Sequence, residues 1–223
     1  MYQPGVPPVK TEDLRKYVFD ELRRIADVFG AVDGSGGQVA LDGRVTLLDA
    51  VYDDLPPSVF STGKLPGANF PAWNAFITAT YAFQFAVNDY LWATPIEVTH
   101  GYEEGTDLML HIHWATGGSN VNARYVKWEV IWTIGNGSEE FSGETTSTVE
   151  VSIPAGAGAT RPYHQISGVV TIPGTAVKIG AYIKARVRRI AATGTAPTSD
   201  PFGLALGVHV QQDTLGSAGL FTK

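Results

Sequence analysis

The sequence contains no cysteine among its 223 residues. Without thiols the protein has no disulfide framework, no thiolate metal site and no cysteine nucleophile. Long apolar runs are also missing, since no stretch approaches the roughly 18 apolar residues of a membrane span. The first ten residues, MYQPGVPPVK, lack the apolar core of a secretory signal. We therefore expect no membrane insertion.

Basic residues are scarce. The chain has 16 Lys and Arg against 22 Asp and Glu, which gives a formal net charge of −6. A broad surface for binding phosphates needs an excess of positive charge, because the phosphate backbone dominates affinity for nucleic acids. We therefore expect no nucleic-acid partner.

Glycine, proline and aromatic residues are abundant, with 25 Gly, 13 Pro and 11% aromatics. This composition is typical of many short strands that are joined by tight turns around a sizeable core. Apolar residues alternate with polar ones in most segments after residue 76, as in Leu108, Leu110, Ile112 and Trp114. The pattern predicts a mainly β fold, an antiparallel β-sandwich that is jelly-roll-like, with one N-terminal amphipathic α-helix.

Three parts are expected along the chain: an extended arm and helix over 1–37, a hairpin and irregular connector over 38–75, and the sandwich over 76–223. Within the connector, a hairpin is expected around Asp42–Gly43. The irregular segment over 53–75 contains four prolines, and we expect Phe60, Phe70 and Trp73 to anchor it.

The helix after Thr11 carries a narrow apolar stripe. Its residues recur at helical spacing: Leu14, Val18, Leu22, Ile25 and Phe29. A lone helix of this length is marginal in water, so the stripe must pack on something. It either packs on the sheet of its own chain or docks onto other copies or a neighbouring protein. The glycine-rich linker over 31–37 favours docking and oligomerisation.

The histidines give the only metal hypothesis. His111 and His113 lie on one face of a strand, and with Gly105 they match the opening of the first cupin motif. The match stops there, because Gly117 and Gly118 stand where that motif needs a glutamate. A complete site would need His100, His164 or His209, brought close through the fold. We expect hydrogen-bonded histidines, buried or between subunits, and no cofactor.

A basic row at Lys184, Arg186 and Arg188 shares one face of a later strand. It is either a surface that meets an acidic partner or a sugar acid, or an outer sandwich face that discourages strand pairing. No catalytic constellation accompanies it: Ser35 and Ser217 do not lie in the nucleophile-elbow pattern. We therefore predict that the protein is not an enzyme and has no catalytic residues.

Two segments resemble a group of tailed-bacteriophage virion proteins. The first, VTHGYEEGTDLMLHIHW, covers residues 98–114 and matches from His100 onward. The second, GVHVQQDTLGSAGLFTK, covers residues 207–223 and matches at His209 and from Asp213 to Ser217. That group has a His-x-His-x-His run in the first segment, but Met109 and Leu110 stand in place of its first histidine and its proline. The departure removes a third strand histidine and weakens the metal hypothesis.

The resemblance implies a virion structural protein, assembled in the host cytoplasm. We expect a tail- or neck-associated fibre or appendage protein that forms a homo-oligomer, most plausibly a trimer, and docks on other virion proteins through its helix. The alternative is a capsid decoration protein (head fibre or cement). A carbohydrate-binding or cupin-like metal-dependent domain is a further alternative, with a host-surface glycan as its partner.

Overall fold

The computed structural model describes Tyr17, Asp20, Glu21, Arg24 and residues 38–39, 45–58, 60–61 and 69–214. The expected docking stripe lies outside these residues: Leu14, Val18, Leu22, Ile25 and Phe29. The N-terminal helix and its docking role therefore stay predictions. The second motif is described only as far as Thr214.

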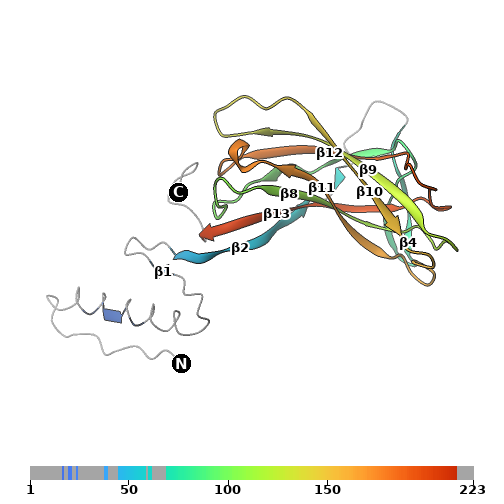
Figure 1. Cartoon of the computed structure of the whole chain (residues 1–223), viewed down its shortest axis with the longest axis horizontal. Coiled ribbons are helices and arrows are strands. Elements are labelled where there is room, and N and C mark those ends of the chain that lie inside the picture. The colour runs from blue at the N-terminus through green and yellow to red at the C-terminus, as the bar shows by residue number, and fades with distance from the viewer. Residues whose placement is uncertain are drawn as a thin grey trace.

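The described residues form two antiparallel sheets that pack face to face (Figure 1). Sheet A contains β1 (Gln38–Val39), β2 (Val45–Ser58), β4 (Ala72–Ile77), β5 (Thr80–Gln84), β8 (Leu108–Ala115), β11 (His164–Ile172) and β13 (Phe202–Thr214). Sheet B contains β3 (Phe60–Ser61), β6 (Tyr90–Ala93), β7 (Ile96–Glu97), β9 (Arg124–Gly135), β10 (Thr145–Ile153) and β12 (Tyr182–Ile190). One short 3₁₀ turn, η1 (Gly174–Ala176), precedes β12.

The strand order is that of a jelly roll. Neighbouring strands of sheet A run β2-β13-β8-β11, and those of sheet B run β6-β12-β9-β10. If these strands are counted in chain order, the two sheets read 1-8-3-6 and 2-7-4-5, which is the pattern of two interlocked Greek keys. The predicted mainly β sandwich is thus confirmed. The β4–β5 hairpin is an addition to this order, inserted between β2 and β6.

The core lies between the sheets, where the alternation predicted it. Leu108, Leu110, Ile112 and Trp114 point inward from β8, and Trp114 packs edge-on against Trp128 of β9 at 6.0 Å between ring centroids. The Trp114 indole donates a hydrogen bond to Ser167 Oγ at 2.8 Å, so its polar atom is satisfied in the interior. Alternation of this kind places every second side chain of a strand in the core.

Two local expectations were wrong. Much of segment 53–75 is strand, because β2 continues through Ser58 and β4 begins at Ala72. Phe60 is buried, as expected of an anchor, but Phe70 and Trp73 are exposed. Between β6 and β7, Pro95 interrupts the strand, since it lacks the N–H that a strand ladder needs.

Candidate functional site

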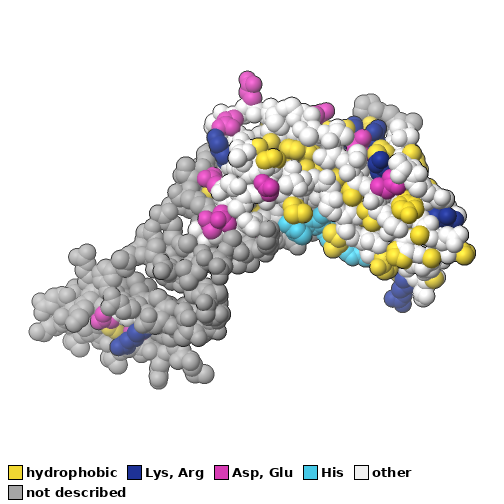
Figure 2. Space-filling model, in the orientation of Figure 1, with side chains coloured by type: hydrophobic (Ala, Val, Ile, Leu, Met, Phe, Trp, Pro, Cys, Tyr) yellow, Lys and Arg dark blue, Asp and Glu magenta, His cyan; other side chains and the backbone are white. Residues whose placement is uncertain are grey.

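Four histidines meet on the outer face of sheet A. His111 Nε2 lies 3.0 Å from His113 Nε2, and His113 Nδ1 lies 3.2 Å from His164 Nε2. The ring of His209 lies 4.2 Å from the ring of His111, measured between centroids. The histidine side chains form one patch on the face shown in Figure 2, with apolar side chains beside it. We call these four residues the histidine chain.

The register of three strands produces the histidine chain. His111 stands opposite Gly168 of β11 and Gly207 of β13, so both of its cross-strand neighbours lack a side chain. The ring lies over Gly207, where a β-carbon would meet it, and is only 4% exposed. A larger residue at position 207 would compete for this space, because directly opposed side chains on one face are close neighbours.

The contacts restrict the proton arrangement. A neutral imidazole has one N–H donor and one acceptor nitrogen. In the chain of contacts from His111 to His164, the two nitrogens of His113 face one histidine each. Each contact needs one donor and one acceptor, so the tautomers of these three rings are coupled. Such an arrangement holds the rings together without help from water.

The histidines do not converge as a metal site does. Among the described residues, no group of three His, Cys, Asp or Glu side chains is placed to hold one metal ion. His113 turns a different nitrogen toward each neighbouring histidine, whereas ligands of one ion turn their donor atoms toward a common centre. The weak candidate pair His111 and His113 stays a prediction, and no chemistry is assigned to it.

Around the histidine chain, the positions of β8, β11 and β13 on the outer face of sheet A carry no charged residue. This face includes ten positions in or near the histidine chain: Met109, His111, His113, Ala115, His164, Ile166, Gly168, Ala205, Gly207 and His209. None of them is Asp, Glu, Lys or Arg. Ile166 is 56% exposed and Met109 is 45% exposed. The register partner of His209 on β2 is Asp54. We call the ten positions the uncharged face.

The outer face of sheet B is charged, and it includes the predicted basic row. Arg188 pairs with Glu129 at 2.8 Å. Arg186 lies over the ring of Tyr90 at 4.9 Å, and Lys184 lies over another aromatic ring of β6. Such contacts between cations and ring faces add modest stability. The basic row lies on β12 in the middle of sheet B, so it does not prevent strand pairing at an edge of the sheet. Each of its three cations already contacts a partner within the chain.

Glu150 lies on β10, the outermost strand of sheet B, in register with Lys127 of β9. The loop after β12 holds its carboxylate in place. Its carboxylate accepts hydrogen bonds from Thr193 N at 2.9 Å, Thr193 Oγ1 at 2.7 Å and Gly194 N at 3.1 Å. These bonds, and to a lesser degree the charge of Lys127, lower the pKa of Glu150 below its ordinary value.

The β4–β5 hairpin carries exposed aromatic side chains, which the sequence patterns did not reveal. Trp73 and Tyr81 are 58% and 54% exposed. Their rings lie nearly parallel, at 16° and 6.4 Å between centroids, and Trp73 also packs against Phe83 at 4.6 Å. One signal in the sequence does mark this region: no charged residue or histidine occurs from residue 65 to 88.

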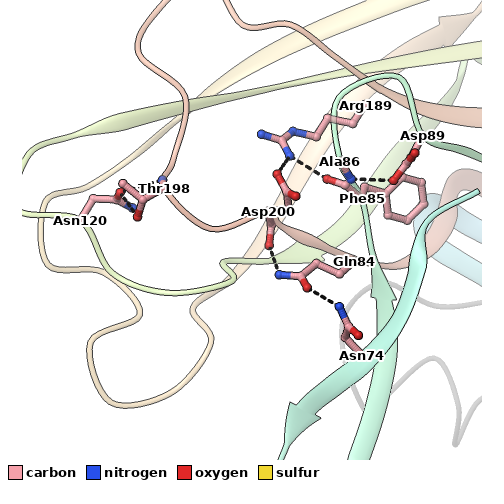
Figure 3. Close-up of polar contacts among 9 residues, drawn as sticks. All are labelled: Asn74, Gln84, Phe85, Ala86, Asp89, Asn120, Arg189, Thr198 and Asp200. Carbon is pink, nitrogen blue, oxygen red and sulfur yellow. Dashed lines mark hydrogen bonds and ion pairs between the residues drawn. The ribbon is translucent and has the colours of Figure 1, made fainter. Parts of the chain in front are cut away.

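A polar network fixes the end of the sandwich beside this hairpin (Figure 3). The buried Arg189 guanidinium pairs with Asp200 and donates to Phe85 O at 2.7 Å. Gln84 donates to Asp200 O at 2.9 Å and accepts from Asn74 Nδ2 at 2.7 Å. An open cavity of about 520 Å³ adjoins the two amides, with Phe76, Phe202, Thr160 and Arg161 among its lining residues.

Comparisons with known proteins assign no family. No protein-family model matches the chain, and no curated protein matches it. Sixteen solved chains match the structure. One is from the infectious bursal disease virus Gx strain, with 7% identity over 79% of this chain and 34% of that one, at a TM-score of 0.35.

Two further matches are equally distant. A CBM35 from Cellvibrio japonicus Abf62 has 17% identity over 77% of this chain and 100% of that one, at a TM-score of 0.32. A D431N mutant VP2 of infectious bursal disease virus has 12% identity over 97% and 50%, at 0.27. The chain spans between a third and a half of the two viral chains that it matches. Likenesses this weak assign it no function.

Membrane insertion finds no support among the helices. None in the described part of the chain is both long and apolar enough to cross a bilayer.

Proposed function

We propose that this protein is a non-enzymatic structural component of a tailed-phage virion, which assembles with copies of itself into a closed homo-oligomer, a trimer. It is a fibre or appendage of the tail or neck, and its N-terminal helix docks on another virion protein. The proposal combines two supports: the contrast between the outer faces of the sandwich and the motif resemblance.

The contrast between the outer faces of sheets A and B is the main support for self-assembly. Sheet B has an outer face with cations and carboxylates, as at Arg188 and Glu129. The uncharged face of sheet A has no such group, and it exposes Met109 and Ile166. Removing charges from water is costly, whereas burying apolar surface is favourable, at about 25 cal/mol per Å². Sheet A is therefore the better face to bury against another subunit.

The histidine chain suits such burial. Polar groups at an interface lose water, and each one left without a partner costs free energy. The rings of His111, His113 and His164 already hydrogen-bond one another. Covering them with a second subunit therefore removes few bonds to water. The expectation that the histidines are hydrogen-bonded, either buried or between subunits, is compatible with this proposal.

The virion assignment rests on the resemblance of segments 100–114 and 209–217 to phage virion proteins. It is tested on phage particles purified from a host strain that carries this gene. Quantitative mass spectrometry is expected to detect the protein at a small copy number divisible by three, and antibody labelling is expected at the tail or neck. Hundreds of copies spread over the shell would instead indicate the decoration protein. Absence from purified particles would contradict both assignments.

A second candidate is glycan binding at the end of the sandwich. The observation in its favour is the cavity, where Asn74 and Gln84 present amides beside the Phe76 ring and Arg161. Amides and aromatic faces are groups that suit sugar hydroxyls and sugar rings. A glycan array probed with the full chain and with an Arg161→Ala variant tests it. Binding that disappears in the variant would support it, and no binding to any host-surface glycan would contradict it.

A further inference from the structure

The β4–β5 hairpin is an uncharged edge of sheet A. Residues 65–88 contain no Asp, Glu, Lys, Arg or His, in a chain where charged residues make up 17% of the total. Within this stretch, Trp73, Ile77 and Tyr81 are exposed large side chains. Isolated exposed apolar residues are ordinary, but a contiguous group of them marks an interaction site.

The backbone of β4 points to the same conclusion. In the described part of the chain, β4 pairs with β5 and with no other strand. An open strand edge is a template for pairing with another chain, and proteins usually protect it with lysine, proline or an inward-pointing charge. The six residues of β4, AWNAFI, contain none of these. Among the described residues, no charge or proline within β4 protects the hairpin against pairing.

The opposite edge of sheet A is equally uncharged. β11 reads HQISGVVTI and pairs only with β8 among the described strands. Its Ile166 and His164 are exposed. The edge strand of sheet B differs, since β10 carries Glu150, which the Thr193–Gly194 loop holds. Uncharged edges thus lie on the two sides of one sheet.

One row of register partners joins the two edges. It runs across five strands through Ala72, Gln84, Phe202, Ala115 and His164. The first residue of this row lies in β4 and the last lies in β11. Both open edges therefore lie at the same height along the strand direction. A second copy of this chain can therefore meet one edge with the other without sliding along the strand direction.

We propose that the β4 edge of one copy packs along the β11 edge of a second copy, so that sheet A continues from subunit to subunit. This inference rests on the self-assembly in the proposed function and adds a contact along the strand edges to the burial of the uncharged face. Contact between two different surfaces is heterologous, and it closes into a ring such as a trimer when the rotation allows. Pairing of β4 with a second β4 would give only a dimer.

The partner is a second copy rather than an unrelated protein for two reasons. Both complementary surfaces, the β4 edge and the β11 edge, are present on the same chain. Each copy also has a net charge of −6, so copies repel one another, and contact surfaces without charge keep this repulsion from being strengthened at the contact itself. The two edges meet that condition, and the outer face of sheet B does not.

The absence of cysteine makes crosslinking a direct test. The full chain with Ala75→Cys and Ile166→Cys is treated with a short bismaleimide, and crosslinked peptides are mapped by mass spectrometry. The matched control replaces Ile166→Cys by Ser152→Cys on the β10 edge. The expected result is an intermolecular link between positions 75 and 166, and none between 75 and 152. An oligomer whose links join only positions 75 and 75, or lack position 75, would overturn the inference.

A charge at the edge provides the second measurement. Ala75→Lys is expected to weaken self-association at least about tenfold, which is about 1.4 kcal/mol, whereas Ser152→Lys on β10 leaves it unchanged. Circular dichroism and the thermal midpoint show that each variant is folded. Equal self-association of both variants and the original chain would overturn the inference while leaving the proposed function intact. A parent chain that is monomeric throughout would overturn both.

Discussion

Gly207 lies directly beneath the imidazole of His111. A β-carbon at position 207 would overlap with Nε2 of that ring and would lie 2.7 Å from its Cε1. The other cross-strand neighbour of His111 is also a glycine, Gly168, yet a β-carbon there would meet nothing within 4 Å. The two glycines thus have different roles, and only Gly207 makes room for the ring.

Gly207→Ala is expected to push His111 out of its place over the sheet. Overpacking of this kind costs about 1–3 kcal/mol. Gly168→Ala is the matched control, with the same added methyl group on the opposite side of the same histidine, and is expected to change stability far less. Urea denaturation of both variants measures the free energies of unfolding. Equal losses in the two variants would contradict the placement of His111.

Asp200→Ala removes the charged partner of Arg189. The guanidinium side chain is 3% exposed and would keep its bond to Phe85 O, while Asp200 is half exposed and water can replace part of its contribution. We expect a loss of about 1–3 kcal/mol, as for a buried donor that loses a partner. Lys178→Met breaks an exposed ion pair with Glu139 and serves as the control. Thermal midpoints that fall equally in both variants would contradict this role.

Glu150 gives the protein a pH-dependent component of stability. Its pKa is lowered in the folded state below the ordinary value of 4.5, first by the backbone N–H of Thr193 and then by its other hydrogen bonds. A group with a depressed folded pKa contributes stability above its unfolded pKa, and this is lost as pH falls through the folded pKa. Glu150→Gln is therefore expected to flatten the decline in thermal midpoint below pH 4.5.

The control for that titration is Glu140→Gln, which makes the same change of charge at an exposed loop position. Its midpoint is expected to follow that of the original chain at each pH. A Glu150→Gln variant whose midpoint declines in acid as steeply as the control would contradict the link between the Thr193–Gly194 loop and acid stability.

Removal of residues 1–37 tests the predicted helix. Because the proposed subunit contact lies in sheet A, the chain from residue 38 onward is expected to keep the native mass of an oligomer while losing its ability to join the particle. Native mass spectrometry and incorporation into virions measure the two properties. A truncated chain that is folded but monomeric would make the helix itself the assembly element.

The inward and outward sides of the long strands were predictable from the sequence. In β8 and β9 the alternation of apolar residues has a period of two over many positions, and only one register buries them, as Trp114 and Trp128 show. The jelly-roll class followed from the number and length of such strands. These features are local, so a single sequence is enough to predict them.

The histidine chain and the exposed hairpin were less predictable. His113 and His164 are 51 residues apart, and only the pairing of β8 with β11 brings them together. Trp73 and Tyr81 look like core residues, because buried strands and exposed contact strands have the same apolar composition. Whether such aromatic residues are buried depends on which other elements pack over them in the fold. The charge-free stretch around them was the one available signal, and it concerns composition rather than periodicity.

The native mass of the purified full chain tests the central claim most directly. At micromolar concentration and neutral pH, we predict a mass of about three times the 23.9 kDa of one chain, as for a closed trimer. The trimer should be the main species across a tenfold dilution. A single species at 23.9 kDa over the whole range would contradict self-assembly through sheet A.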